Sequence, residues 1–199
     1  VEQGVVRLIR VRDNGSGIDP DDLALALARH ATSKIASFDD LQHVASLGFR
    51  GEALPSMASV SRLTLTSRMA GQESGWRVEG DGGDSVAAPA PASHPPGTTV
   101  EARDLFFNVP ARRKFLRSER TELTQIERLV ERLALSRFDV GFRLQAARRV
   151  LADFPPARDE RGRAARVAAV LGGEFIANAP KPDHEGAGLR LSGWFCLPT

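Results

Sequence analysis

Apolar and polar residues alternate in three short stretches of the first half of the chain, and each stretch predicts a β-strand. Residues 5–12 form a β-rich run, residues 62–68 alternate with a period of two, and residues 98–103 resume a strand. Between the last two, residues 80–97 are rich in Gly, Ala and Pro, which is typical of a hairpin loop or a flexible insertion. We therefore expect three strands in this part of the chain.

Helical signals follow the first predicted strand. Asp19 suits an N-cap position and Pro20 suits the first helical turn, while Leu23, Leu27 and Ala31 fall on one helical face. The pattern therefore predicts a helix that begins near residue 20.

Three further helices are expected along the chain. Two are short, at residues 38–44 and 52–60, and Pro55 is tolerated in the second only within its first turn. The clearest helix covers residues 121–138, and its apolar face comprises Leu123, Ile126, Leu129, Val130 and Leu133.

A change of composition near residue 157 indicates a domain boundary. Residues 155–162 have the Pro, Gly and charged composition of a linker, and they are followed by a helical stretch and a strand at residues 189–197. We place one domain at residues 1–157 and part of a second at residues 158–199, which is too short to be a whole domain.

The composition is that of an ordinary globular protein, with 42 % hydrophobic and 26 % charged residues among 199. Because the net charge is only +2, the total charge does not indicate nucleic-acid binding, and the local clustering of Arg is the more informative signal. The single cysteine, Cys196, excludes a disulfide framework and a multi-cysteine metal site. No apolar run approaches membrane-spanning length and no secretory signal opens the sequence, so we expect a cytoplasmic, nucleoid-associated protein without a membrane partner.

The common nucleotide-binding signatures are absent, since there is no GxxxxGK[ST] loop and no GxGxxG after a strand. A carboxylate, Asp13, instead ends the first predicted strand and is followed by Gly15 and Gly17. Glycines let the backbone approach a ligand closely, and an ionised carboxylate accepts a hydrogen bond from an amino group such as that of adenine. The competing interpretation is a plain Asp-Asn-Gly turn.

Three other strings each have a ligand-binding and a structural interpretation. Residues 48–54 (GFRGEAL) place two glycines and an Arg before a helix, where they form either an anion site or a helix-start loop with a solvated Arg. Residues 30–34 (HATSK) offer hydroxyls and an ammonium to a phosphate, or else they cap a helix C-terminus. Residues 97–99 (GTT) offer a Thr hydroxyl to a ligand, or else they form an ordinary turn.

Taken in order, these strings resemble the GHKL ATPase family. The strings HATSK, GFRGEAL and NVPARRKFL (residues 108–116) are similar to the MutL branch rather than to gyrase, Hsp90 or histidine kinases, and the resemblance covers essentially the whole chain. It implies an α+β fold, in which a Bergerat sandwich of a mixed sheet carries helices on one face. The beginning of a ribosomal-S5-like βαβ transducer domain should follow. The alternatives are another GHKL protein, such as a type II topoisomerase or a chaperone, and a non-enzymatic DNA-binding scaffold.

The resemblance also implies a nucleotide site and a function. Asp13 should bind the adenine amino group, and residues 31–51 should form an ATP lid. The implied nucleotide-binding residues are Asp13, Gly15, Gly17, Ile18, Thr32, Ser33, Lys34, Gly48, Phe49, Arg50, Gly51, Glu52, Ala53, Leu54 and Thr98. The implied function is DNA mismatch repair by an ATPase with ATP and Mg²⁺ as cofactors. It should form a homodimer on nucleotide binding and couple mismatch recognition by MutS to a downstream nuclease or helicase.

When the sequence is compared with the family's motifs, residues 1–199 contain no counterpart of the family's catalytic groups. The general-base Glu and the Asn that ligates Mg²⁺ would precede Val1, and a Lys that reaches the γ-phosphate would follow residue 199. We therefore assign no catalytic and no metal-binding residue to residues 1–199. We expect the intact protein to hydrolyse ATP slowly and this chain to be deficient in hydrolysis.

Five basic residues lie within nine positions, from residue 112 to residue 120. A contact with DNA phosphates, dependent on salt and independent of base sequence, is one interpretation, and a solvated patch at the start of a helix is the other. The DNA-binding candidates are Arg112, Arg113, Lys114 and Arg117.

Overall fold

The computed structural model describes residues 1, 6–28, 31, 50–80 and 87–196. The helix expected at residues 38–44 lies outside the described residues. The chain falls into two compact units, Val1–Glu122 and Leu123–Thr199, and each is described by itself.

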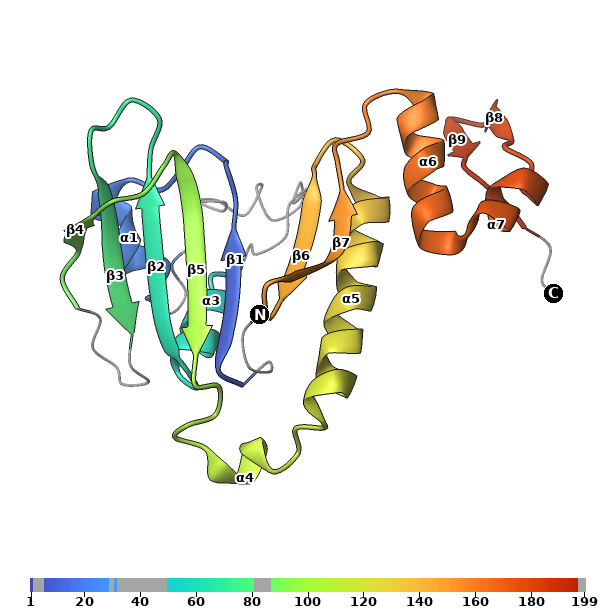
Figure 1. The fold of residues 1–199 in the computed structure, drawn as a ribbon. Coiled ribbons are helices and arrows are strands. Elements are labelled where there is room, and N and C mark those ends of the chain that lie inside the picture. The colour runs from blue at the N-terminus through green and yellow to red at the C-terminus, as the bar shows by residue number, and fades with distance from the viewer. Residues whose placement is uncertain (2–5, 29–30, 32–49, 81–86, 197–199) are drawn as a thin grey trace. The chain divides into compact units, whose positions relative to one another are not determined.

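The first unit is built on a five-stranded sheet (Figure 1). In sheet order its strands are β1 (Leu8–Arg12), β5 (Gly97–Arg103), β2 (Arg62–Arg68), β3 (Gly75–Gly80) and β4 (Ala90–Ala92). All four strand pairs are antiparallel, so the mixed character that we expected is not seen among the described strands. The edge strand β4 lies inside the stretch predicted as a loop or insertion, and its Pro91 is tolerated because an edge strand need not donate every N–H.

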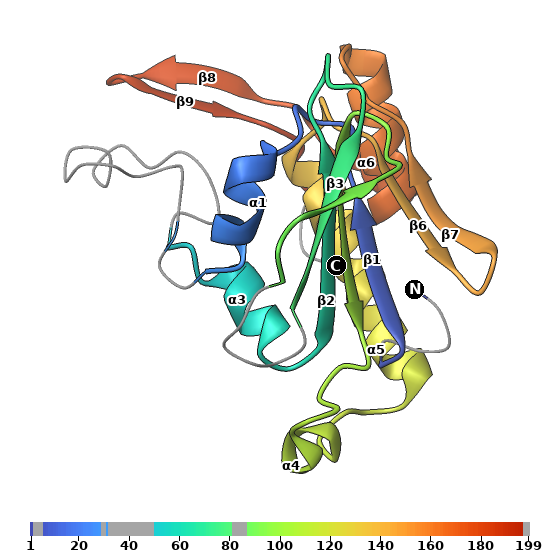
Figure 2. The same ribbon diagram turned by 90° about the vertical axis from the view of Figure 1, so that its left-hand side faces the viewer.

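Two short helices cover one face of this sheet, as Figure 2 shows. They are α1 (Pro20–Ala26) and α3 (Ala53–Ala58). Side chains alternate between the faces of a strand, so Leu63 and Leu65 of β2 point toward the helices. There they form a core with the buried side chains Leu23, Leu27, Val78 and Ala102.

The start of α1 agrees with the sequence, whereas its end does not. Asp19 is the N-cap, and its carboxylate accepts a hydrogen bond from the backbone N–H of Asp21 at 3.0 Å. The helix ends at Ala26, well before Ala31, because Leu27 already donates to a carbonyl three residues back and tightens the final turn.

The second helix on this face, α3, begins directly after Glu52. Pro55 is its third residue and therefore lies in the first turn, where its missing N–H breaks no helical hydrogen bond.

The second unit contains helices and two separate hairpins. After α4 (Pro110–Arg113) in the first unit, the chain continues through α5 (Glu119–Ser136), β6 (Phe142–Ala146), β7 (Arg149–Phe154), α6 (Glu160–Leu171), α7 (Gly173–Asn178), β8 (Asp183–Gly186) and β9 (Leu189–Ser192). The strand predicted at residues 189–197 ends at Ser192, and Cys196 lies exposed beyond it. Leu129, expected on the apolar face of α5, is 54 % exposed.

The two compact units divide inside α5, whereas we placed the domain boundary after residue 157. Arg166 of α6 explains part of this difference, because its guanidinium binds backbone carbonyls of α5 and of the end of β7. The boundary at residue 157 rests on linker composition and stays a prediction. None of the described helices combines the length and the apolar character needed to cross a membrane.

Candidate functional site

The carboxylate of Asp13 lies directly after β1 and is fixed by the neighbouring strand β5. Asp13 donates its N–H to the carbonyl oxygen of Thr98 at 2.9 Å. Its Oδ1 accepts hydrogen bonds from the N–H of Gly15 at 2.9 Å and from the N–H of Thr98 at 3.2 Å. No group of the described residues donates to Oδ2, so this oxygen keeps its capacity to accept a hydrogen bond.

Ser67 of β2 connects the loop after β1 to the sheet. It is fully buried, and its hydroxyl accepts a hydrogen bond from the N–H of Ile18 at 2.8 Å. The same oxygen lies 3.0 Å from the carbonyl oxygen of Gly97 and 2.9 Å from the hydroxyl of Thr98. Sequence reasoning missed Ser67. The available signal was a small polar residue at an inward position of a strand, following Leu63 and Leu65.

Two glycines allow the loop of residues 13–17 to lie directly against the sheet. Gly17 has a φ of +80°, and a Cβ built on it would lie 2.2 Å from the carbonyl oxygen of Arg68. Gly97 has a φ of +119°, and its Cβ would lie 2.3 Å from the carbonyl oxygen of Asp13. Both positions therefore exclude a side chain. We call the seven residues Asp13, Gly15, Gly17, Ile18, Ser67, Gly97 and Thr98 the Asp13 cluster.

The two ends of the predicted lid lie against each other. Gly51 has a φ of +63°, and a Cβ built on it would lie 2.3 Å from the carbonyl oxygen of Ala31. Arg50 is exposed, Glu52 is half-buried, and Leu54 packs against the core beneath α3. The remaining predicted lid residues, Thr32, Ser33, Lys34, Gly48 and Phe49, lie outside the described residues.

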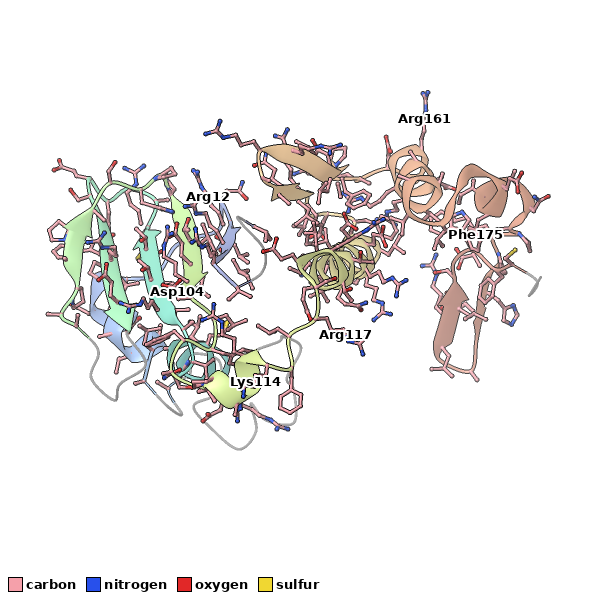
Figure 3. All side chains as sticks on the ribbon, turned by 60° about the horizontal axis from the view of Figure 1, so that its bottom comes forward. Arg12, Asp104, Lys114, Arg117, Arg161 and Phe175 are labelled. Atoms are coloured by element: carbon pink, nitrogen blue, oxygen red, sulfur yellow. The ribbon has the colours of Figure 1, made fainter. Side chains whose placement is uncertain are left out.

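The four DNA-binding candidates all lie on or just after α4. Arg112, Arg113, Lys114 and Arg117 are exposed. Among the described residues, none of the four side chains forms an ion pair with a carboxylate. Figure 3 shows Lys114 on the α4 segment and Arg117 farther along the chain.

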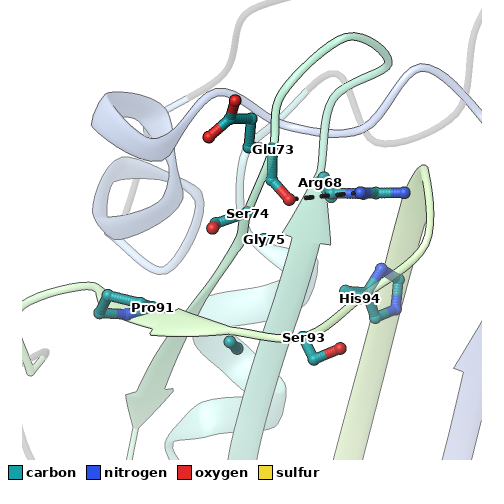
Figure 4. A pocket seen from close by; sticks show the side chains of 8 residues that line it. Arg68, Glu73, Ser74, Gly75, Pro91, Ser93 and His94 are labelled. Carbon is teal, nitrogen blue, oxygen red and sulfur yellow. Dashed lines mark hydrogen bonds between the residues drawn. The ribbon is translucent and has the colours of Figure 1, made fainter.

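A cavity of about 340 Å³ lies at the turn between β2 and β3, beside β4 (Figure 4). Its lining consists of Arg68, Glu73, Ser74, Gly75, Pro91, Ala92, Ser93 and His94. The Nε2 of His94 lies 2.7 Å from the hydroxyl of Thr99. Since Arg68 and Thr99 alternate with the inward-facing Ser67 and Thr98, the cavity opens on the sheet face opposite to the helices. It shares no residue with the Asp13 cluster, and we base the candidate site on the cluster because its groups fit a specific ligand chemistry.

The antiparallel sheet, the helices on one face and the clamped loop after β1 form the fold of GHKL ATP-binding domains. A solved N-terminal domain of a DNA repair protein has this fold, with a TM-score of 0.74 and 23 % identity over 97 % of this chain and 61 % of that one. The ATPase domain of Aquifex aeolicus MutL, solved as a complex with ADP, matches with a TM-score of 0.72 and 30 % identity. That match covers 100 % of this chain and 68 % of the Aquifex chain. The α+β fold class expected from the sequence is thereby confirmed.

The chain belongs to the MutL family of DNA mismatch repair proteins. It is 57 % identical to the MutL of Pseudomonas putida strain W619 and 59 % identical to that of Azotobacter vinelandii, in both cases over all 199 residues. It spans about a third of the length of these relatives, 31 % in each case. A search against protein-family models gave no match.

Proposed function

We propose that the protein containing these residues is an ATP-binding and ATP-hydrolysing switch of DNA mismatch repair. Membership of the MutL family supports this function, and so does the ADP held by the related Aquifex domain. The observation that carries the nucleotide part is the Asp13 carboxylate, of which one oxygen is held by two backbone N–H groups and the other accepts no protein hydrogen bond among the described residues.

The geometry of the Asp13 cluster suits the recognition of adenine. Oδ2 of Asp13 is an acceptor for one N–H of the 6-amino group, while Oδ1 keeps the carboxylate in place. Ser67 and Thr98 hold the two strands behind it, and the absence of side chains at Gly17 and Gly97 lets the loop that carries Asp13 lie directly against β2 and β5.

The remaining nucleotide residues are proposed from the family alone. The lid of residues 31–51, together with Glu52, Ala53 and Leu54, would wrap the phosphates and contact the γ-phosphate. Ala31 and Gly51, which lie in contact, would then form the fixed base of this lid.

Hydrolysis requires groups that we do not assign to this chain. The described residues contain no group of three or more His, Cys, Asp or Glu side chains that could hold a metal ion. We propose that residues 1–199 bind nucleotide without hydrolysing it. The intact protein would hydrolyse ATP with Mg²⁺ through a general-base Glu and a metal-ligating Asn supplied by the family's N-terminal helix.

We extend the proposal to the partners of the intact protein by family membership. Nucleotide binding would drive homodimerisation, and the dimer would connect the mismatch-recognition protein MutS to a downstream nuclease or helicase on DNA. The proposed location is the bacterial cytoplasm, close to the nucleoid.

Asp13→Asn tests the nucleotide site. Oδ1 receives two N–H donors, so the Asn oxygen must keep this position and the NH₂ group must take the place of Oδ2. The substituted chain should fold normally but present a donor to the adenine amino group, itself a donor. A non-hydrolysable ATP analogue at about 100 times its Kd should stabilise the original chain by about 2.7 kcal/mol in thermal denaturation, and Asp13→Asn should lose this stabilisation.

Asp22→Asn on α1 is the matched control and should keep the stabilisation. Inosine triphosphate carries an oxygen acceptor in place of the 6-amino group, so it should not stabilise the original chain, whose Oδ2 is also an acceptor, whereas the NH₂ group of Asp13→Asn can donate to that oxygen. When the original chain is incubated with ATP and Mg²⁺, the phosphate released should not exceed that of a sample without protein. Equal stabilisation of the original chain and Asp13→Asn would contradict the assignment of Asp13.

A second candidate function is a non-specific DNA contact through the basic segment, which we define as residues 108–118. It contains four cations and no carboxylate, and the four cations are exposed. Such a surface releases counterions from the DNA backbone, which gives affinity that depends on salt and not on base sequence.

Charge reversal tests the DNA contact. Lys114→Glu with Arg117→Glu should abolish binding of a labelled duplex at low salt, measured by fluorescence anisotropy, because two phosphate contacts are replaced by repulsion. Arg148→Glu with Arg149→Glu, in the exposed turn of the β6–β7 hairpin, makes the same change in net charge and should leave most binding intact. Equal losses in the two double variants would show that total charge, and not the basic segment, holds the DNA.

A further inference from the structure

The basic segment carries one exposed aromatic side chain. Phe115 is 85 % exposed and is flanked in sequence by Lys114 and, two residues later, by Arg117. Its neighbour Leu116 is half-buried, so the chain turns one apolar side chain inward and leaves the larger one in solvent. An exposed Phe alone needs no explanation, but a Phe inside a run of cations without a carboxylate is a specific combination.

Backbone hydrogen bonds close the turn that carries this exposed side chain. The N–H groups of Lys114, Phe115 and Leu116 donate to the carbonyls of Pro110, Arg112 and Arg113 at 3.1 to 3.2 Å. Phe115 is therefore presented by a closed turn after α4 and not by an open loop.

Both ends of the basic segment are attached to the rest of the first unit. The side-chain amide of Asn108 donates to the carbonyl oxygen of Ser59 at 2.9 Å, directly after α3. At the other end, the N–H of Arg117 donates to the carboxylate of Glu122 at 3.0 Å, and the hydroxyl of Ser118 accepts a hydrogen bond from the N–H of Thr121 at the start of α5. The backbone that carries the ring is thus held by hydrogen bonds before any ligand binds.

We propose that Phe115 stacks on an unpaired base of single-stranded nucleic acid whose phosphates lie on the surrounding cations. The inference rests on the proposed DNA contact and adds a preference for unpaired strands. Cations that follow a backbone, combined with an aromatic ring that meets a base, are the two elements of single-strand binding, and the ring tolerates any base because each has a π-face. In a duplex the bases are stacked on each other, so the ring has no partner there.

Phe115→Ala in the 199-residue chain tests the stacking. Binding of labelled oligo(dT) should weaken roughly tenfold in anisotropy titrations, while duplex affinity and the dependence of both affinities on salt should stay unchanged. Phe115→Trp should restore oligo(dT) binding. An oligomer of the same length with abasic sugars keeps the phosphates without the bases, and it should bind the original chain and Phe115→Ala equally. Leu129→Ala removes another exposed apolar side chain and should have no effect.

The outcomes separate the two proposals. If Phe115→Ala leaves oligo(dT) affinity unchanged while Lys114→Glu with Arg117→Glu abolishes it, the DNA contact stands and the stacking is wrong. A loss of the same size for duplex and abasic oligomer would also overturn the stacking, since it would show that Phe115 supports the segment and not a base. If the original chain binds duplex but not oligo(dT) at low salt, only the stacking is wrong, and if it binds neither, both proposals are wrong.

Discussion

Gly17→Ala should destabilise the first unit by more than about 3 kcal/mol and should remove nucleotide binding altogether. The left-handed backbone of Gly17 costs a non-glycine residue roughly 1–2 kcal/mol. The larger contribution is steric, because the new Cβ would lie 2.2 Å from the carbonyl oxygen and 2.6 Å from the carbonyl carbon of Arg68. Both atoms belong to the backbone of β2, so no side-chain rotation relieves the overlap.

The expected displacement reaches the candidate site directly. Ile18 follows Gly17 and donates its N–H to the buried hydroxyl of Ser67. If the loop moves away from β2, this hydrogen bond breaks and a fully buried hydroxyl loses a partner, which adds to the loss of stability. Asp13 at the other end of the same loop would also shift relative to Thr98.

Gly71→Ala is a control that separates the two contributions. Gly71 has a φ of +89°, close to that of Gly17, but nothing lies within 4 Å of a Cβ built on it. Its substitution should therefore show only the backbone penalty of roughly 1–2 kcal/mol and should leave nucleotide binding intact. Urea denaturation followed by the fluorescence of Trp76 would measure the free energy of unfolding of the Gly17→Ala and Gly71→Ala variants. A Trp194→Phe background ensures that the signal comes from the first unit alone. Similar losses at Gly17 and Gly71 would refute the close approach of the loop and β2.

Local sequence signals predicted the elements whose causes are local. Asp19 and Pro20 determine the start of α1 through capping and a fixed φ, and both act within a few residues. The alternation in residues 62–68 likewise identified β2. Strands β3, β4, β6, β7 and β8 were missed. In β3 and β6 a signal was available, because apolar and polar residues alternate at positions 76–79 and 142–146. β4, in contrast, is three residues of small and cyclic side chains without such a pattern, and among the described strands it pairs with β3.

The candidate site shows the same division. Asp13 and its glycines were predicted as site residues from the order of the motifs, which is a property of the sequence. Ser67 was not, because its role depends on β2 and β5 being neighbours in register, with Ser67 opposite Thr98. The contact between Asp13 and Thr98 spans 85 positions of the chain and follows from the pairing of β1 with β5. No window of a few residues contains that information.

Arg166 is the residue whose importance the sequence conceals most, since an Arg in a helix is ordinarily solvated. It is 4 % exposed, and its guanidinium donates to the carbonyl oxygens of Ala134 and Arg137 at 3.0 Å and of Phe154 at 3.3 Å, and also to that of Pro155. The first two are carbonyls at the C-terminus of α5, which lack helical partners and favour a positive charge. Burial lowers the pKa of this guanidinium, but from an ordinary value so high that the group stays charged.

Arg166→Met should therefore destabilise the second unit by about 3–4 kcal/mol, since four hydrogen bonds are lost at about 1 kcal/mol each. Arg163→Met is the matched control. Arg163 lies on the same helix and, like Arg166, places its guanidinium within 6 Å of the Phe138 ring, at 5.9 Å against 5.7 Å. Because Arg163 is exposed, its loss should change stability by less than about 1 kcal/mol. Trp194, whose ring centroid lies 6.3 Å from that of Phe138, reports on this unit in a Trp76→Phe background during urea denaturation. If both variants lose the same small free energy of unfolding, Arg166 contributes through its cation–π contact and not through its hydrogen bonds to the carbonyls. Apolar packing would then have to hold α6 against α5 and β7.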